Sequence, residues 1–288
     1  MQEPNPLIDE FHARGYIILR RVLQAHVVAD VVAELEKWVD ARAREWRDSG
    51  QIADPSADEP FERRLVCLHE QLASGSAAKT LRRELHWPGM FGLFFQAQLL
   101  DLIESILGPE IRLYPNYSIR PKLPRHAPTK VLWHQDAGYT SSGLHGGDAK
   151  AGDLRVDQLR MVNAWSPLVP ARIANGCMKF VPGSHKLGVV PHESREFYLE
   201  IVPQVLEPHL KDAVDIECDP GDVVLFSNLL FHMGQDNAAD TVRWSADWRY
   251  QDATQSTLRA HRGHLARSAA HADKVVRSAE HWTQLSFI

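Results

Sequence analysis

The sequence predicts a mainly β protein with flanking α-helices, whose core is an antiparallel β-sandwich or jelly roll. Two observations predict this fold class. Between Ile111 and about Tyr250, short runs of β-branched and aromatic residues alternate with segments rich in Gly, Pro, Asn and Asp. No helical crossover separates these runs, which excludes a parallel sheet. Apolar residues at helical spacing precede and follow this region, so helices are expected on either side of the core.

Seven segments of the β region have the composition of short strands. Each is bounded by residues that favour turns. The expected strands are IRLYPNYSI (111–119), KVLWHQD (130–136), QLRMVNAWSPL (158–168), CMKFVPG (177–183), VDIECD (214–219), DVVLFSN (222–228) and TVRWSADWRY (241–250).

The first third of the chain is predicted to be helical. From Ala25 to Arg47, apolar side chains recur every three or four residues with charges between them. A second helical region is expected from Phe91 to Leu107, ended by Gly108-Pro109. Beyond Tyr250 helical spacing returns, for example at Leu258 and Leu265. We therefore expect a single domain over 1–288, with a mainly helical part (1–110), a β core (111–250) and a C-terminal helical segment (251–288).

Composition and charge argue against a nucleic-acid binder and against a membrane-spanning protein. The 288 residues are 44% apolar and 24% charged, with a formal net charge of −5, which argues against a nucleic-acid partner. No apolar run is long enough for a membrane span, and the N-terminus lacks the pattern of a signal peptide. The three cysteines have neither disulfide nor metal spacing. We expect a soluble, cytoplasmic protein, and the sequence leaves its oligomeric state unknown.

The segment Trp133-His134-Gln135-Asp136 is the first candidate for a functional site. One residue separates His134 from Asp136, so on a strand both side chains point to the same face. An imidazole and a carboxylate on one face can bind two adjacent positions of a divalent metal. A His-x-Asp tripeptide is common by chance, and a simple His–Asp hydrogen bond explains it equally well.

A second segment adds a histidine and an arginine. The run 219–232 is a turn and an apolar strand that ends at His232, and Arg243 follows eleven residues later. The polar stretch Gly234–Asp240 between them is expected to be a turn, which places His232 and Arg243 on neighbouring antiparallel strands. A buried arginine there needs an anion, because an unpaired buried charge is costly.

Two histidines and one carboxylate form the facial triad of non-haem Fe(II) oxygenases. Such a triad leaves three metal positions open, enough for the bidentate end of 2-oxoglutarate and for O2. The forked guanidinium of Arg243 suits the distal carboxylate of 2-oxoglutarate.

At this point the sequence resembles the phytanoyl-CoA dioxygenase family of Fe(II)- and 2-oxoglutarate-dependent oxygenases. The motifs that carry the resemblance are WHQD (133–136), NGCMKFVPGSHK (175–186), PGDVVLF (220–226) and His232 with Arg243. The resemblance implies a double-stranded β-helix (jelly roll, cupin-like) core. It implies that His134, Asp136 and His232 bind iron and that Arg243 binds 2-oxoglutarate.

Further roles are implied by position. Asn163 and Trp165 match residues that line the cosubstrate pocket in relatives, and Arg120 lies where several relatives place a polar residue near cosubstrate or substrate. Trp165 is equally explained as a core aromatic, and Arg120 as a surface arginine. Relatives that halogenate lack the carboxylate ligand, so Asp136 favours hydroxylation. Where relatives often carry a small hydroxyl residue, this chain has Gly234.

The predicted activity is hydroxylation of an unactivated C–H bond in a small-molecule metabolite, with Fe(II), 2-oxoglutarate and O2 as cofactor and cosubstrates. The glycine-rich segment Thr140–Asp157 is expected to be a mobile loop over the substrate. Two alternatives stay open: a catalytically inactive jelly-roll binding protein, and a cupin-type metalloenzyme that does not use 2-oxoglutarate. Arg243 argues against the second, because such an enzyme needs no carboxylate anchor.

Overall fold

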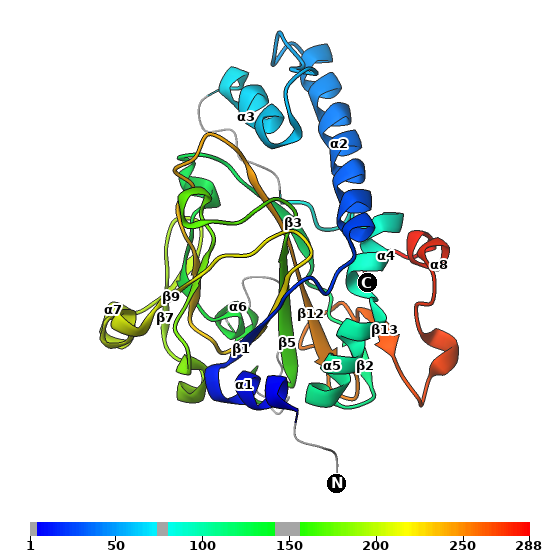
Figure 1. Cartoon of the computed structure of the whole chain (residues 1–288), viewed down its shortest axis with the longest axis vertical. Helices are drawn as coiled ribbons and strands as arrows, with labels where there is room; N and C mark the ends of the chain where they lie inside the picture. The colour runs from blue at the N-terminus through cyan, green and yellow to red at the C-terminus, as the bar shows by residue number, and fades with distance from the viewer. Residues whose placement is uncertain (1–4, 74–79, 142–155) are drawn as a thin grey trace.

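The predicted fold class is confirmed: two antiparallel β-sheets pack face to face, and helices cover the outer face of the larger sheet (Figure 1). The computed structural model describes residues 5–73, 80–141 and 156–288. Most of the expected loop at 140–157 lies outside these residues.

The larger sheet has seven strands, in the order β1-β10-β5-β12-β2-β13 with β3 also paired to β12. Its strands are β1 (Tyr16–Leu19), β2 (Ile111–Leu113), β3 (Ser118–Lys122), β5 (Met161–Pro167), β10 (Val223–Ser227), β12 (Arg243–Asp252) and β13 (His264–Arg267). The smaller sheet runs β4-β11-β6-β9, and β7 pairs with β8 alone. These strands are β4 (Val131–His134), β6 (Met178–Phe180), β7 (His192–Ser194), β8 (Leu199–Ile201), β9 (Val214–Ile216) and β11 (His232–Gly234).

Helices are concentrated before the first strands of the core. The α-helices are α1 (Pro6–Arg14), α2 (Ala25–Asp48), α3 (Phe61–Gln71), α4 (Pro88–Phe94), α5 (Ala97–Leu107), α6 (Asp136–Ser141), α7 (Pro203–Leu206) and α8 (Ala279–Gln284). Short 3-10 helices lie at Ala127–Thr129, Val156–Gln158, Ile173–Asn175, Ser184–Leu187, Glu207–Asp212 and Ala272–Lys274.

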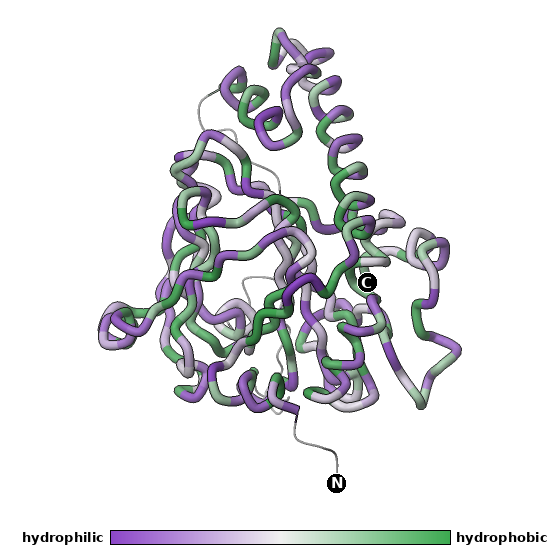
Figure 2. Tube along the Cα trace, viewed as in Figure 1, coloured by the Kyte–Doolittle hydropathy of each residue, from purple (hydrophilic) through white to green (hydrophobic). Residues whose placement is uncertain are grey.

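The main apolar core lies between the larger sheet and the helices α2, α4, α5 and α8. The long helix α2 turns Val31, Leu35 and Val39 inward, and Figure 2 shows hydrophobic and hydrophilic residues alternating along it. From the sheet side, Trp244 and Trp248 of β12 are fully buried in this layer. Packing, more than helix propensity, therefore fixes these helices against the sheet.

A second core fills the space between the two sheets. Tyr16 of β1, Phe226 of β10 and Phe180 of β6 meet there, with Phe180 5.1 Å from the Tyr16 ring and 5.2 Å from the Phe226 ring, between centroids. Phe226 and Trp165 of this core also line a cavity that contains polar residues of both sheets.

Strand β12 has two chemically different faces. Its even-numbered residues from Trp244 to Tyr250 pack under the helices, whereas its odd-numbered residues, beginning with Arg243, point between the sheets. Such an alternation follows from the period of two along a strand. The polar face of β12 is therefore placed toward the interior of the sandwich.

Several local predictions are confirmed and others are corrected. The helix predicted from Ala25 to Arg47 is present as α2. The single helical region expected over 91–107 is two helices, α4 and α5, bent by 44° at a short break. The C-terminal segment was predicted helical, but Leu265 lies in strand β13, which pairs with β2. Edge pairing with β2 overrides the helical spacing of this short segment.

No single helix among the described residues is long and apolar enough to cross a membrane. Only the bent pair α4 and α5 passes such a test, by length and composition alone. Both helices pack in the main core. The three cysteines are free thiols.

Candidate active site

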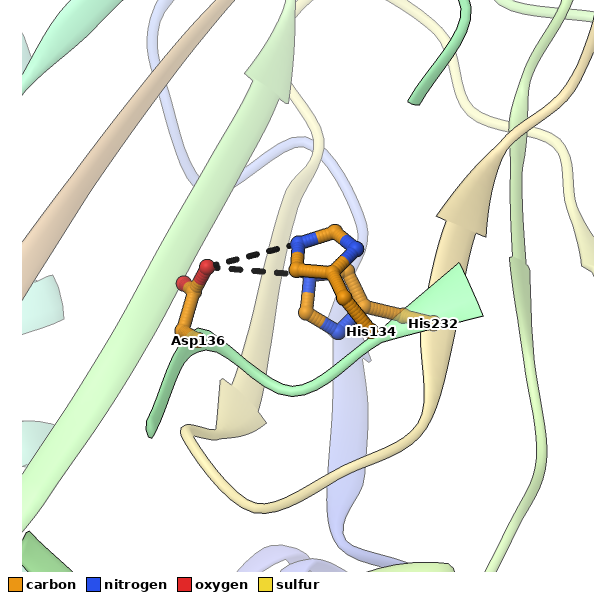
Figure 3. Close-up of side chains that lie close together, drawn as sticks. All are labelled: His134, Asp136 and His232. Atoms are coloured by element: carbon orange, nitrogen blue, oxygen red, sulfur yellow. Dashed lines mark ion pairs between the residues drawn. The ribbon is translucent and has the colours of Figure 1, made fainter. Parts of the chain in front are cut away.

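Two histidines face each other across the smaller sheet. His134 ends β4 and His232 begins β11, and the two residues are direct partners in the antiparallel register. Their ring centroids are 4.0 Å apart, and both side chains are nearly fully buried. Figure 3 shows the two rings close together, with Asp136 to one side and dashed lines from its carboxylate to both histidines.

Asp136 completes the cluster from a different element than predicted. The sequence placed it on the strand of His134, but β4 stops at His134 and Asp136 begins helix α6. Its Oδ1 lies 3.5 Å from Nε2 of His134 and 4.0 Å from Nε2 of His232. One ligand atom from each residue lies within 4.8 Å of the others, close enough to hold a metal ion.

Backbone carbonyls fix the tautomer of both histidines. Nδ1 of His134 is 2.7 Å from the carbonyl oxygen of Leu132, and Nδ1 of His232 is 2.9 Å from that of Leu230. A carbonyl can only accept, so each Nδ1 donates its proton and each Nε2 keeps a free lone pair. This arrangement orients the imidazoles as metal ligands.

The charges of the cluster also suit a cation. Burial, together with the neighbouring His134 ring, lowers the pKa of His232 to about 3, so its imidazole is neutral at pH 7. Burial alone would raise the pKa of Asp136, but Arg249 and the two histidines outweigh it and hold that pKa well below its usual range. A carboxylate and neutral imidazoles are the protonation states that metal binding requires.

Hydrogen bonds from the neighbouring motifs hold the cluster in position. The Gln135 amide nitrogen donates to the carbonyls of Gly188 and Leu229, both at 2.7 Å, which ties the ligand segment to two loops. The Ser184 hydroxyl accepts from the backbone N–H of Phe231 at 2.8 Å, directly before His232. Ser184 thus braces the chain just before His232, and His185, the next residue of the same motif, lies outside the metal cluster.

Arg249 holds the metal-facing carboxylate and was not found from the sequence. Its Nε and Nη2 donate to Oδ2 of Asp136 at 3.1 and 2.8 Å, so Oδ1 is the oxygen turned toward the histidines. Arg249 also donates to Asp247 at 3.0 Å and to the Asn116 carbonyl at 2.8 Å. This fork fixes which carboxylate oxygen is available to a metal.

We expect the substitution Arg249→Met to lower Mn(II) affinity about 10–100-fold, because Asp136 loses the partner that orients it. Mn(II) titration of the folded protein below its unfolding temperature measures the change. The control is Arg63→Met, which removes an exposed arginine that pairs with Asp240. Unchanged Mn(II) affinity in folded Arg249→Met protein would contradict the orienting role.

Arg243 is a buried guanidinium without a carboxylate partner among the described residues. It is 4% exposed, and it donates to the Ser245 hydroxyl at 2.5 Å and to the Gly176 carbonyl at 3.0 Å. Its Nε has no partner, and burial lowers its pKa to about 10, so it stays charged at pH 7. A left-handed φ of +81° at Gly176, where a Cβ would lie 2.5 Å from the Gln235 carbonyl oxygen, accounts for glycine in this contact.

The predicted relation between Arg243 and His232 is wrong in its topology. They do not lie on neighbouring strands: β11 pairs with β4 and β6, whereas β12 pairs with β2, β3 and β5. The link between them crosses from the smaller sheet to the larger one, and both residues still line the same cavity.

Two of the three remaining predicted residues, Trp165 and Arg120, line the same cavity, whereas Asn163 is the register partner of Arg249 and is not among the lining residues. The Arg243 guanidinium carbon is 5.5 Å from the Trp165 ring centroid, and Trp165 lines the cavity. Asn163 is buried on β5, and neither its amide oxygen nor its nitrogen has a partner in the described ranges. Arg120 lines the cavity and donates to Asp247 at 2.7 Å. The unpaired Nε of Arg243 faces the cavity and can donate to an anionic ligand there.

The cavity is wide and carries several basic groups. It encloses about 1160 Å³ including its open mouth. On β3 and β12, Lys122 is the register partner of Arg243, and Arg120 that of Ser245. The Lys122 ammonium donates to the carbonyls of Thr129 and Gly234, at 3.0 and 3.1 Å. By contrast, the aromatic group at Trp87, Phe91, Phe94 and Phe95 packs in the main core, outside this cavity.

Lys122, Ser245, Asp247 and Arg249 were missed as site residues. A signal for three of them is present in RWSADWR (243–249), where polar residues alternate with Trp and Ala. With period two, this pattern puts every second residue on one face with Arg243. Lys122 has the same signal two residues after Arg120.

A jelly roll with a His-Asp-His cluster and a basic cavity has the architecture of a non-haem iron oxygenase. Comparison with known proteins agrees. The description "Phytanoyl-CoA dioxygenase (PhyH)" matches over residues 11–245, and the chain belongs to this family. It is therefore a member of the Fe(II)- and 2-oxoglutarate-dependent oxygenases, whose cofactor and cosubstrates are Fe(II), 2-oxoglutarate and O2. No curated protein matches the chain.

Solved structures share the fold at low identity. A non-haem monooxygenase, ThoJ in its apo form, is 21% identical with a TM-score of 0.58, over 91% of this chain and 84% of ThoJ. EctD from S. alaskensis, solved with 2-oxoglutarate and 5-hydroxyectoine, is 20% identical with a TM-score of 0.57, over 88% and 77%. The epimerase SnoN, solved with Fe3+, α-ketoglutarate and nogalamycin RO, is 21% identical with a TM-score of 0.57, over 88% and 86%.

Proposed function

We propose that this protein hydroxylates an unactivated C–H bond of a small-molecule substrate and converts 2-oxoglutarate to succinate and CO2. The observation that carries the proposal is the pairing of two groups in one cavity. A cluster able to hold a metal, His134, Asp136 and His232, faces the same space as Arg243, a buried cation with no carboxylate partner among the described residues. A metal centre and an anchor for an anionic cosubstrate are the two parts that the chemistry needs.

In this proposal His134, Asp136 and His232 hold Fe(II), which supplies the activation of O2. Arg243 and Ser245 bind the distal carboxylate of 2-oxoglutarate, with Trp165 beside the guanidinium. The unpaired amide of Asn163 donates to a cosubstrate oxygen closer to the metal. Arg120, the register partner of Ser245 on β3, also lines the cavity, and we assign it to the substrate.

Hydroxylation is favoured over halogenation because Asp136 occupies the third ligand position. The family fold also supports other outcomes: SnoN is described as an epimerase and SnoK as a carbocyclase. Hydroxylation is proposed here as the simplest outcome for an intact triad, and product analysis with a substrate decides it.

The single-domain organisation predicted over 1–288 is also proposed. It is supported by the pairing of both ends of the chain into one sheet, β1 with β10 and β13 with β2. The cytoplasmic location stays a prediction.

The test is an anaerobic titration of the purified protein with Fe(II) and 2-oxoglutarate. We expect the weak visible charge-transfer band of chelated 2-oxoglutarate, and succinate release once O2 and a substrate are added. Iron binding without this band would favour a cupin-type enzyme that does not use 2-oxoglutarate. Absence of iron binding in folded protein would favour a catalytically inactive binding protein.

A further inference from the structure

A short extended segment brings one more arginine to the lining of the cavity. Leu81 forms an isolated antiparallel bridge with Ile119 of β3, through two backbone hydrogen bonds of 3.0 Å. Leu81 and Ile119 are both fully buried in the main core. Because neighbouring side chains of an extended chain alternate, Thr80 and Arg82 turn to the opposite side, and both line the cavity.

A hydrogen bond holds Arg82 in place, but no carboxylate among the described residues pairs with it. Its Nη1 donates to the Asn116 side-chain oxygen at 2.7 Å, and the Asn116 carbonyl accepts from Arg249, so Arg82 is joined to the metal-side network. Within the described part of the chain, Arg82 makes no ion pair and its Nε and Nη2 make no hydrogen bond. Burial and the nearby charge of Arg120 lower the pKa of Arg82 to about 10, which leaves it charged at pH 7.

Arg120 supplies a second guanidinium that has N–H groups without a partner among the described residues. Its Nε donates to Asp247, while its two terminal nitrogens have no partner among the described residues. Asp247 is itself shared with Arg249, so a single carboxylate serves two arginines. Arg249 also pairs with Asp136, so these two carboxylates can balance Arg120 and Arg249 but leave the charge of Arg82 and the terminal nitrogens of Arg120 available.

The whole cavity has an excess of positive charge. Four arginines line it, against two carboxylates from the described residues, Asp136 and Asp247. Lys122 is not counted, because burial and the nearby Arg243 hold its pKa well below its usual range. Fe(II) and the 2-oxoglutarate dianion bring opposite charges of equal size, so loading both does not remove the excess. Arg243 is committed to 2-oxoglutarate in the proposed function, which leaves Arg82 and Arg120 for another anion.

We propose that Arg82 and Arg120 form an anion-binding subsite of the substrate pocket, and that the substrate carries a carboxylate, sulfonate or phosphate group bound there. The anionic group contacts these two guanidinium groups, and the carbon to be oxidised points toward the metal cluster. The subsite rests on the geometry of β3 and the segment 80–82. Its assignment to the substrate of an oxygenation rests on the proposed function.

The test uses inorganic sulfate as the probe and the Zn(II)-loaded protein saturated with 2-oxoglutarate. Calorimetric titration at constant ionic strength should give saturable sulfate binding. Arg82→Gln should weaken it at least about tenfold, since a charge-assisted pair in a partly buried site is worth more than about 1.4 kcal/mol. The matched control is Arg83→Gln, which removes the exposed arginine next in the chain.

Three results would overturn the subsite: no saturable sulfate binding by the wild type, full binding by folded Arg82→Gln protein, or equal weakening by Arg83→Gln. Repeating the titration with Arg243→Met separates the two proposals. One outcome is that Arg243→Met protein still binds sulfate and that this binding depends on Arg82, while wild-type protein with Fe(II) and 2-oxoglutarate gives no charge-transfer band. In that case the anion subsite stands and the proposed oxygenase function fails. If the band forms but sulfate does not bind, only the subsite fails.

Discussion

We expect His134→Ala to abolish both the charge-transfer band and 2-oxoglutarate-dependent succinate release. His134 supplies one of the three ligand atoms that lie within 4.8 Å of one another. Loss of even an outer partner of a metal ligand costs about 10–100-fold in affinity or activity, so loss of a ligand should cost more than about 100-fold. Anaerobic absorption spectra and succinate assays measure the two losses separately.

The control is His26→Ala, because His26 is an exposed histidine at the start of α2. It should leave the band and the turnover unchanged, and its unfolding temperature shows the effect of an ordinary His→Ala substitution. A His134→Ala protein that is folded and keeps full turnover would show that the metal ligands are assigned wrongly.

Arg243→Met should separate cosubstrate binding from stability. The 2-oxoglutarate dissociation constant should rise by about 30- to 3000-fold, since truncating one partner of a buried charge pair costs about 2–5 kcal/mol. Without cosubstrate, the unfolding temperature should stay equal or increase, because the variant no longer buries an unpaired cation. Titration of the charge-transfer band and thermal unfolding with and without 2-oxoglutarate test both parts.

Arg44→Met provides the matched control, since Arg44 is an exposed arginine on α2. Its effect on the 2-oxoglutarate dissociation constant should be negligible. Wild-type affinity in Arg243→Met protein would remove Arg243 as the anchor and would leave the orphaned Nε without explanation.

Local sequence patterns predicted much of the fold and the central site. The helix from Ala25 was identified because its apolar residues follow one face, and the seven strand segments because turn residues bound them. The three metal-cluster residues were identified because each lies in a short motif, although Asp136 proved to begin a helix. Spacing along the chain was sufficient for these features.

Long-range pairing limited the prediction. His232 and Arg243 are only eleven residues apart, which suggested a hairpin, yet their strands join different sheets. The same limit applies to Leu265, whose segment pairs with β2 more than 140 residues earlier along the chain. Sequence spacing also could not place Arg82 beside Arg120, because the bridge between Leu81 and Ile119 joins two distant segments.

The register of β12 determines both the packing of its tryptophans and the position of its charged residues. A one-residue slip of this strand would turn its tryptophans into the cavity and its arginines into the apolar layer under the helices. The burial of Trp244 and Trp248 thus sets the register of β12 that turns Arg243 and Arg249 toward the cavity. A change of register that moved these charged groups would also remove the tryptophans from the core.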